Sequence, residues 1–170
     1  MDYTVIIDNL PLYLSGLWVT IQLVVLALVT GFGLAVPLAL LAVSKNSLLR
    51  YPAKAYIYFF RGTPLLVQMF MIYHGMAQFE AVRESVLWIV FKEAYWCAIT
   101  AFALNTAAYT AEILRGAIEQ TPFGEIEAAN ASGMSKFTLY RRIILPGSFR
   151  RALPAYGNEV IFMLHGSALA

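Results

Sequence analysis

The sequence predicts an all-α fold: a polytopic bundle of about four membrane-spanning helices with one water-facing insert. Hydrophobic residues make up 60% of the 170 residues and charged residues only 13%, and the mean hydropathy is positive. Long runs of the chain contain no charged residue, and a polar, helix-forming segment separates the last two of them. A composition this apolar is typical of membrane proteins, so we expect residues 1–170 to form a single transmembrane domain.

Residues 16–43 form the first expected span. The run from 9 to 44 contains no charged residue and is long enough to cross a hydrocarbon core of about 30 Å. Gly31, Gly33 and Pro37 lie within this run. Glycine and proline inside a membrane helix predict a kink or a close contact with another helix at this point.

Three further spans are expected along the chain. The second covers residues 56–78, and we expect Pro64 to bend it near its start. The third covers residues 94–113, and the fourth covers residues 152–170. The single cysteine, Cys97, lies inside the third run, so it suggests neither a disulfide nor a metal site.

The distribution of charge predicts the topology. Lys and Arg concentrate in residues 44–55 and 115–151, whereas residues 79–93 are slightly acidic. Cytoplasmic connections of membrane proteins are enriched in Lys and Arg, so the two basic connections should face the cytoplasm and the N-terminus the outside. The net charge of +2 gives no reason to expect a nucleic-acid partner, and membrane lipid is the first partner implied.

Residues 120–146, which we call the polar insert, should form a helix, a turn and a second helix. Charges cost a few kcal/mol each in hydrocarbon, so this segment must face water. Thr121 is expected to cap the first helix, with the following proline at its first position. Gly133 should end that helix in a left-handed conformation, and Ser135 should cap the second. Taken alone, such a segment could be a plain solvated connector.

Seven residues in the insert occupy a fixed pattern. They are Glu127, Ala128, Ala129, Gly133, Ile143, Leu145 and Pro146. This pattern resembles the EAA loop of bacterial binding-protein-dependent ABC importer permeases. Residues 61–68 (RGTPLLVQ), 105–116 (NTAAYTAEILRG) and 153–159 (LPAYGNE) resemble the polar amino-acid subfamily. The ending at 158–165 is similar to the M-type subunits of histidine, lysine, arginine and ornithine permeases and of opine permeases.

The resemblance implies a type I ABC importer permease fold in the bacterial inner membrane, with a periplasmic N-terminus. The chain would be a transporter subunit for polar, basic amino acids or opines rather than an enzyme. Its insert would dock on an ATP-binding cassette subunit, which binds the ATP and Mg; no phosphate-binding loop motif occurs in this sequence. The other implied partners are a second permease subunit, favouring a heteromer, and a periplasmic solute-binding protein. Relatives continue into a fifth membrane helix, so we expect a C-terminally truncated chain.

Polar side chains within the expected spans are candidates for a substrate pathway, because such groups are costly in lipid and turn toward the bundle interior. The candidates are Gln68, Asn105, Tyr109, Asn158, Glu159 and His165. The amides of Gln68 and Asn105 could equally serve only to join helices. Glu159 suits a cationic substrate, whereas Glu112 is explained by an i,i+3 ion pair with Arg115.

Two other functions are compatible with a polytopic helical chain. An intramembrane enzyme could use Glu112, Glu159 and His165 as acid and base groups, but the sequence lacks His-Glu-x-x-His and Gly-x-Ser-x-Gly motifs. A passive channel would need no ATPase, and the polar insert would then have no role.

Overall fold

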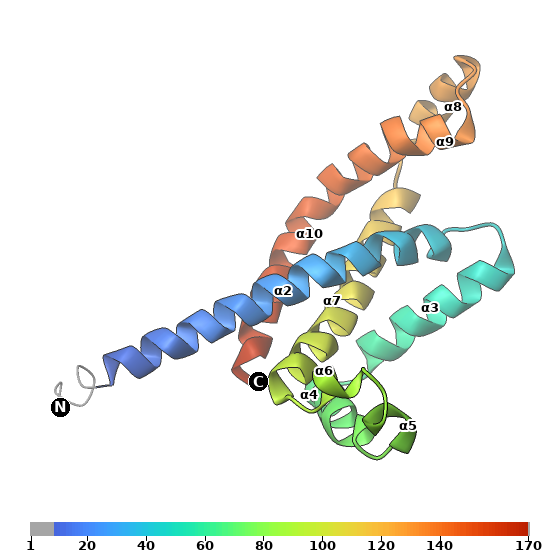
Figure 1. Cartoon of the computed structure of the whole chain (residues 1–170). Coiled ribbons are helices and arrows are strands. Elements are labelled where there is room, and N and C mark those ends of the chain that lie inside the picture. The colour runs from blue at the N-terminus through green and yellow to red at the C-terminus, as the bar shows by residue number, and fades with distance from the viewer. Residues whose placement is uncertain (1–8, 170) are drawn as a thin grey trace.

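The computed structural model describes residues 9–169, a range built from helices and short connections (Figure 1). In chain order these are α2 (Leu10–Ala42), α3 (Ser47–Gly62), α4 (Leu65–Phe70), the π-helical turn η1 (Met71–Gly75), α5 (Glu80–Arg83), α6 (Trp88–Phe91), α7 (Ala94–Glu119), α8 (Phe123–Ala131), α9 (Lys136–Leu139), the π-helical turn η2 (Tyr140–Ile144), α10 (Leu145–Gly166) and the 3-10 turn η3 (Ser167–Leu169).

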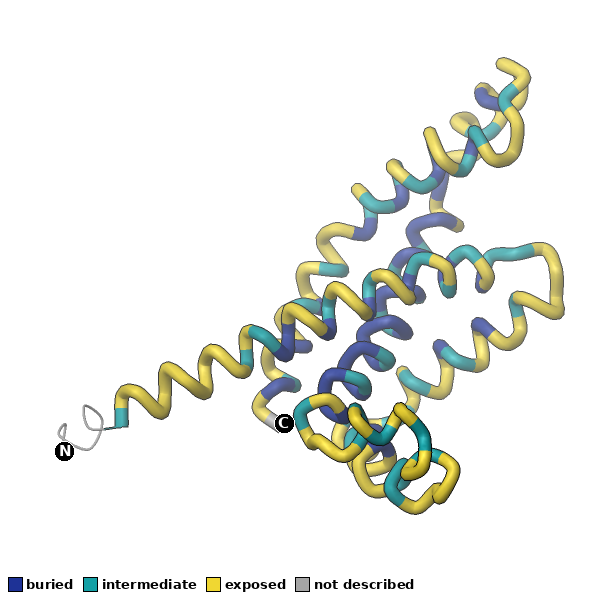
Figure 2. Tube along the Cα trace, viewed as in Figure 1, coloured by how far each residue is buried: buried dark blue, intermediate teal, exposed yellow. Residues whose placement is uncertain are grey.

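Helix α7 is the centre of the bundle. It contacts α2, α3, α4 and α10, and its backbone trace is the most continuously buried part of the chain in Figure 2. Ala101, Ala107 and Ala108 on this helix have no exposed surface. Alanine allows neighbouring backbones to approach closely, which is how membrane helices gain packing energy where hydrocarbon offers no hydrophobic drive.

The first predicted helix meets α7 through its glycine. A Cβ atom at Gly31 would overlap Cγ2 of Thr106 and lie 3.0 Å from the carbonyl oxygen of Ala103. The close contact that the sequence predicted is therefore present, and α2 continues unbroken through Pro37. The helix also begins at Leu10, earlier than the predicted 16, with a proline in its first turn, where proline is tolerated.

The segment 56–78, predicted as one span bent at Pro64, is divided into separate helices at this proline. Helix α3 starts at Ser47, where Oδ1 of Asn46 accepts a hydrogen bond from the backbone N–H of Leu48 at 3.0 Å, and it ends at Gly62. Thr63 and Pro64 are both extended, and α4 starts anew at Leu65. Proline disfavours the helical conformation of the residue before it, so Pro64 separates two helices instead of bending one.

The second half of the polar insert is continuous with the last helix. Helices α9 and α10 are joined through η2, giving one helical run from 136 to 166, whereas the sequence predicted a separate last helix from 152. Pro146 lacks an N–H and its ring crowds the preceding turn, which the wider π-helical turn before it relieves. Helix α7 likewise continues past the predicted 113, to Glu119.

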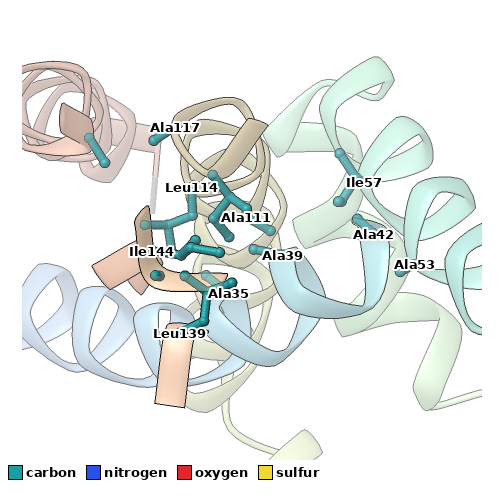
Figure 3. Close-up of a cluster of buried hydrophobic side chains, with 13 residues drawn as sticks. Ala35, Ala39, Ala42, Ala53, Ile57, Ala111, Leu114, Ala117, Leu139 and Ile144 are labelled. Carbon is teal, nitrogen blue, oxygen red and sulfur yellow. The ribbon is translucent and has the colours of Figure 1, made fainter. Parts of the chain in front are cut away.

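The two basic connections lie at one end of the bundle. A buried cluster there joins α2, α3 and α7 to the polar insert through Ala42, Ala53, Leu114 and Leu139 (Figure 3). Ala129 of α8 belongs to the same cluster. The acidic connection, which contains α5 and α6, lies at the opposite end (Figure 1). This separation agrees with the alternation of loops predicted from charge. By length and composition, two of the described helices, α2 and α7, could each cross a membrane alone.

Replacing Gly31 with valine should destabilise the bundle. The added side chain would meet the buried Thr106 and a backbone carbonyl, neither of which can move freely, and overpacking of this kind costs roughly 1–3 kcal/mol. Thermal unfolding of the detergent-purified protein should show a lower midpoint for Gly31→Val. The matched control is Gly33→Val, because a Cβ there meets no atom within 4 Å; equal losses in both variants would contradict the packing argument.

Candidate functional site

A cavity of about 520 Å³, with a few polar and charged side chains in a largely apolar wall, lies where the break between α3 and α4 faces α7 and α10. Its lining residues are Arg61, Gly62, Thr63, Pro64, Leu65, Asn105, Tyr109, Glu159, Phe162 and Met163. The extended Thr63 and Pro64 form part of the wall, so the proline that divides the two helices also opens the cavity. The structure thus brings together three of the predicted pathway residues, namely Asn105, Tyr109 and Glu159.

The amides of Gln68 and Asn105 hold this break in place. Nε2 of Gln68 donates to the carbonyl oxygens of Phe60 and Thr63 at 2.8 and 3.0 Å, and to Oγ1 of Thr63 at 2.7 Å. Its Oε1 accepts a bond from Nδ2 of Asn105 at 3.1 Å. Carbonyl groups at a helix end lack hydrogen-bond donors within the helix, and here the buried side chain of Gln68 is their donor. Gln68 joins helices but does not line the cavity. Asn105 joins helices and also lines the cavity.

Glu159 is the buried acid of the cavity. It is only 8% exposed, and its Oε1 accepts a hydrogen bond from Oγ1 of Thr106 at 3.2 Å. The same Thr106 carries the methyl group that packs against Gly31. One side chain of α7 therefore contacts α2 through its methyl group and α10 through its hydroxyl group.

Arg61 is the cation of the cavity wall and was not among the pathway residues predicted from the sequence. Its guanidinium carbon lies 5.3 Å from the ring centroid of Tyr109, whose hydroxyl donates to the Arg61 carbonyl oxygen at 3.4 Å. NH1 of Arg61 also lies 3.8 Å from Oε1 of Glu112. Its place in the RGTP motif, directly before the helix break, was the signal available in the sequence.

The ion pair predicted between Glu112 and Arg115 is present. Nε and NH2 of Arg115 donate to the two carboxylate oxygens of Glu112, each at 2.7 Å. NH1 of Arg115 reaches Oε2 of Glu119 at 2.7 Å. With Arg61, these groups form a chain of alternating charges beside the cavity, longer than the local pair that the sequence indicated.

Asn158 and His165 are not brought to the cavity. Their seven-residue spacing places them on one face of α10, as predicted, but both are exposed and neither lines the cavity. The neighbouring Glu159 points into the bundle instead. Within residues 9–169, no group of three or more His, Cys, Asp or Glu side chains could hold a metal ion.

The polar insert has the expected turn at Gly133 and the expected cap at Ser135, but not the expected cap at Thr121. Gly133 has φ of +72°, and Oγ of Ser135 accepts a hydrogen bond from the backbone N–H of Thr138 at 3.2 Å. Thr121 does not cap α8: its hydroxyl donates to the carbonyl oxygen of Ile118 at 2.8 Å and accepts from Arg151. The proline after it is the N-cap, and not the first helical residue.

The residues of the fixed pattern differ in exposure. Glu127, Ala128, Gly133 and Pro146 are exposed, Ile143 and Leu145 are half-buried, and Ala129 is buried at 2%. Helices α8 and α9 project beyond the rest of the bundle (Figure 1). The insert therefore presents Glu127, Ala128 and Gly133 on a surface that the rest of the chain leaves uncovered, together with the exposed rings of Phe123 and Phe137.

A helical bundle with a cavity between its helices and a projecting polar insert is the architecture of a transporter membrane subunit. The chain matches the family described as "Binding-protein-dependent transport system inner membrane component" over residues 27–170. It belongs to that family, and this assigns it to the inner membrane.

Named relatives and solved structures agree with this assignment. The chain is 50% identical to the nopaline transport system permease protein NocM of Agrobacterium fabrum, covering 100% of this chain and 71% of the relative. It is 52% identical to the octopine transport system permease protein OccM of Rhizobium radiobacter, covering 92% of this chain and 64% of the relative. For the histidine/lysine/arginine/ornithine permease protein HisM of Salmonella typhimurium the identity is 49%, covering 92% and 67%.

The fold matches "an amino acid ABC transporter with histidines" with a TM-score of 0.85 and 36% identity, over 99% of this chain and 75% of the other. A methionine ABC transporter, MetNI, matches with a TM-score of 0.78 at 19% identity, which speaks for the fold alone. The resemblance seen in the insert is thus confirmed. It favours a permease subunit over an intramembrane enzyme or a passive channel.

Substituting Gln68 with leucine should destabilise the protein. The change removes the donor Nε2 from the carbonyl oxygen of Thr63 at the end of α3. It also takes one of two partners from the carbonyl oxygen of Phe60 and from Nδ2 of Asn105, at a cost of about 1–3 kcal/mol. The midpoint of thermal unfolding in detergent should fall. Gln78→Leu is the matched control because Gln78 is exposed. A midpoint for Gln68→Leu equal to that of the control would mean that the amide network does not hold the break.

Proposed function

We propose that this chain is a permease subunit of an ATP-driven importer that moves basic amino acids or opines across the bacterial inner membrane. The names of its relatives include nopaline, octopine and the basic amino acids, which supports this substrate class. The N-terminus is proposed to be periplasmic, with the acidic connection on the same side and the polar insert in the cytoplasm.

One observation carries the proposal: the insert and the cavity share a helix. The helical run from 136 to 166 starts in the polar insert and carries Glu159 into the cavity. A force applied to the insert would therefore be transmitted to the cavity along this continuous helical run. This is the mechanical connection that an importer needs if a partner ATPase drives it.

The cavity suits an amino acid with a cationic side chain. Its volume of about 520 Å³ lies within the range of about 300–1,000 Å³ usual for small-molecule sites. The buried carboxylate of Glu159 would attract a cationic side chain, and the guanidinium of Arg61 would attract a carboxylate group. Asn105 and Tyr109 would supply polar contacts along the α7 wall. Asn158 and His165 would contribute to a pathway only where another subunit packs against their face of α10.

The proposed partners follow from the family. Two ATP-binding cassette subunits would bind ATP and Mg and receive the exposed surface around Glu127 and Ala128, with Gly133 providing the turn. Ile143, Leu145 and Pro146 would connect this surface to α10. A second permease subunit, forming a heteromer, would complete the membrane part, and a periplasmic solute-binding protein would deliver substrate.

The direct test is reconstitution of the intact importer, with the full-length permease, in liposomes. Uptake of labelled arginine, histidine or octopine should require ATP and the binding protein, and substrate should stimulate ATP hydrolysis. Absence of stimulation by all of these compounds would contradict the substrate class. Uptake that proceeds without ATP would indicate a channel.

Replacing Glu159 with glutamine should weaken transport of cationic substrates. Loss of one buried charge-assisted contact lowers affinity by about tenfold or more, seen as a higher concentration for half-maximal uptake. Glu84→Gln is the matched control, since this carboxylate is exposed and does not line the cavity. Unchanged uptake by Glu159→Gln would remove this residue from the site.

Crosslinking should identify the surface that meets the ATPase. In a Cys97→Ala background, cysteine at Ala128 or Ser132 should crosslink to the ATPase in membranes with a yield that depends on ATP, because both positions are exposed. Cysteine at Ala129 is the control, since that position is buried and should react poorly. Efficient crosslinks from Ala129 alone would mean that the docking face is assigned wrongly.

A further inference from the structure

Arg151 occupies a position at the base of the polar insert that the proposed function does not use. Its Nε and NH2 donate to the carbonyl oxygen of Ala117 at 3.2 and 3.1 Å. NH2 also donates to Oγ1 of Thr121 at 2.8 Å and to Oγ of Ser148 at 3.2 Å. Ala117 lies in the last turn of α7, Thr121 lies at the start of the insert, and Ser148 lies on α10 just after the insert. The guanidinium thus closes the insert into a loop.

The acceptors are suited to this contact. The carbonyl oxygens in the last turn of α7 have no partner within the helix, and Gly116 and Ile118 find theirs in the following backbone. The carbonyl oxygen of Ala117 instead receives Arg151 and the hydroxyl of Ser148, the latter at 3.3 Å. A cation also interacts favourably with the negative end of the helix dipole.

The surroundings keep the guanidinium in place. Ala117, Thr121 and Ser148 are all buried, at 6%, 8% and 1% exposure. Gly147 lies beneath the guanidinium, since a Cβ there would come within 3.2 Å of NH1 of Arg151. Arginine is the side chain that can reach several acceptors at once, because its donors form a rigid planar fork.

We infer that Arg151 is a positioning residue that makes the two ends of the polar insert move together, so that motion at its tip is passed to both α7 and α10. Without this contact, α7 and α10 could separate at the base, and a push on the insert would bend the base instead of moving the cavity walls. The inference rests on the proposed function. Arg151 would set how efficiently ATP hydrolysis drives transport, and it would take no part in ATP hydrolysis or in substrate binding.

The test measures substrate molecules transported per ATP hydrolysed by the intact importer in liposomes. Arg151→Gln should assemble and hydrolyse ATP, while its transport per ATP falls several-fold, because motion of the insert no longer reaches both α7 and α10. Arg151→Lys should recover part of the loss, since a single ammonium group cannot reach all of the acceptors. Arg150→Gln is the matched control because Arg150 is the exposed neighbour and should retain the wild-type ratio.

A wild-type ratio in Arg151→Gln would overturn the inference. If that variant does not assemble, Thr121→Val can be used, because it removes one acceptor alone. A wild-type ratio of transport to ATP hydrolysis in both single variants, Thr121→Val and Arg151→Lys, would also overturn the inference. Failure of the proposed function is separate, since the wild-type importer would then show no ATP-dependent uptake. In that case the contact itself can be tested with a cysteine at Ser132 in the Cys97→Ala background. Its rate of reaction with a water-soluble thiol reagent is compared between Arg151→Gln and Arg150→Gln. Equal rates would contradict a role of Arg151 in holding the insert.

Discussion

The contacts of Thr106 determine how the three longest helices meet. Its methyl group occupies the space that the missing side chain of Gly31 leaves on α2, and its hydroxyl group bonds to Glu159 on α10. The side chain is fully buried in the middle of α7. Because the apolar contact fixes the rotation of α7 against α2, it also decides which face of α7 remains for the cavity. Asn105 and Tyr109 lie on that remaining face.

The cavity is a consequence of backbone chemistry at Pro64. A helix cannot continue through the residue before this proline without strain, and the freed carbonyl groups need partners in an apolar surrounding. Gln68 and Asn105 provide them, and the cost of interrupting the helix is thereby reduced. The space opened by the interruption holds a cation and a carboxylate on its walls. Thr63, Pro64 and Asn105 therefore belong both to the interruption of the helix and to the wall of the candidate binding site.

The last helical run, 136 to 166, connects the polar insert to the cavity. A π-helical turn allows Pro146 to lie inside a continuous helix, so the polar insert and the cavity wall are one element. The contacts of Arg151 add a second connection, to the end of α7. An insert attached to the bundle in this way can transmit movement in a defined direction, which a flexible connector could not do.

The sequence alone determined the class of the protein, the family and the character of the insert. Charge-free runs, basic connections and the pattern from Glu127 to Pro146 are local features, and the turn at Gly133 and the cap at Ser135 followed from residue type. The sequence could not reveal that Thr121 turns away from α8 to meet Arg151. Nor could it reveal that 56–78 divides into two helices whose break is held by the amides of Gln68 and Asn105. It placed Asn158 beside Glu159 but could not show that Glu159 is buried against Thr106 while Asn158 stays exposed. These features depend on which distant residues are close in space, because a polar group takes the partner that burial makes available, and only the tertiary structure sets that partner.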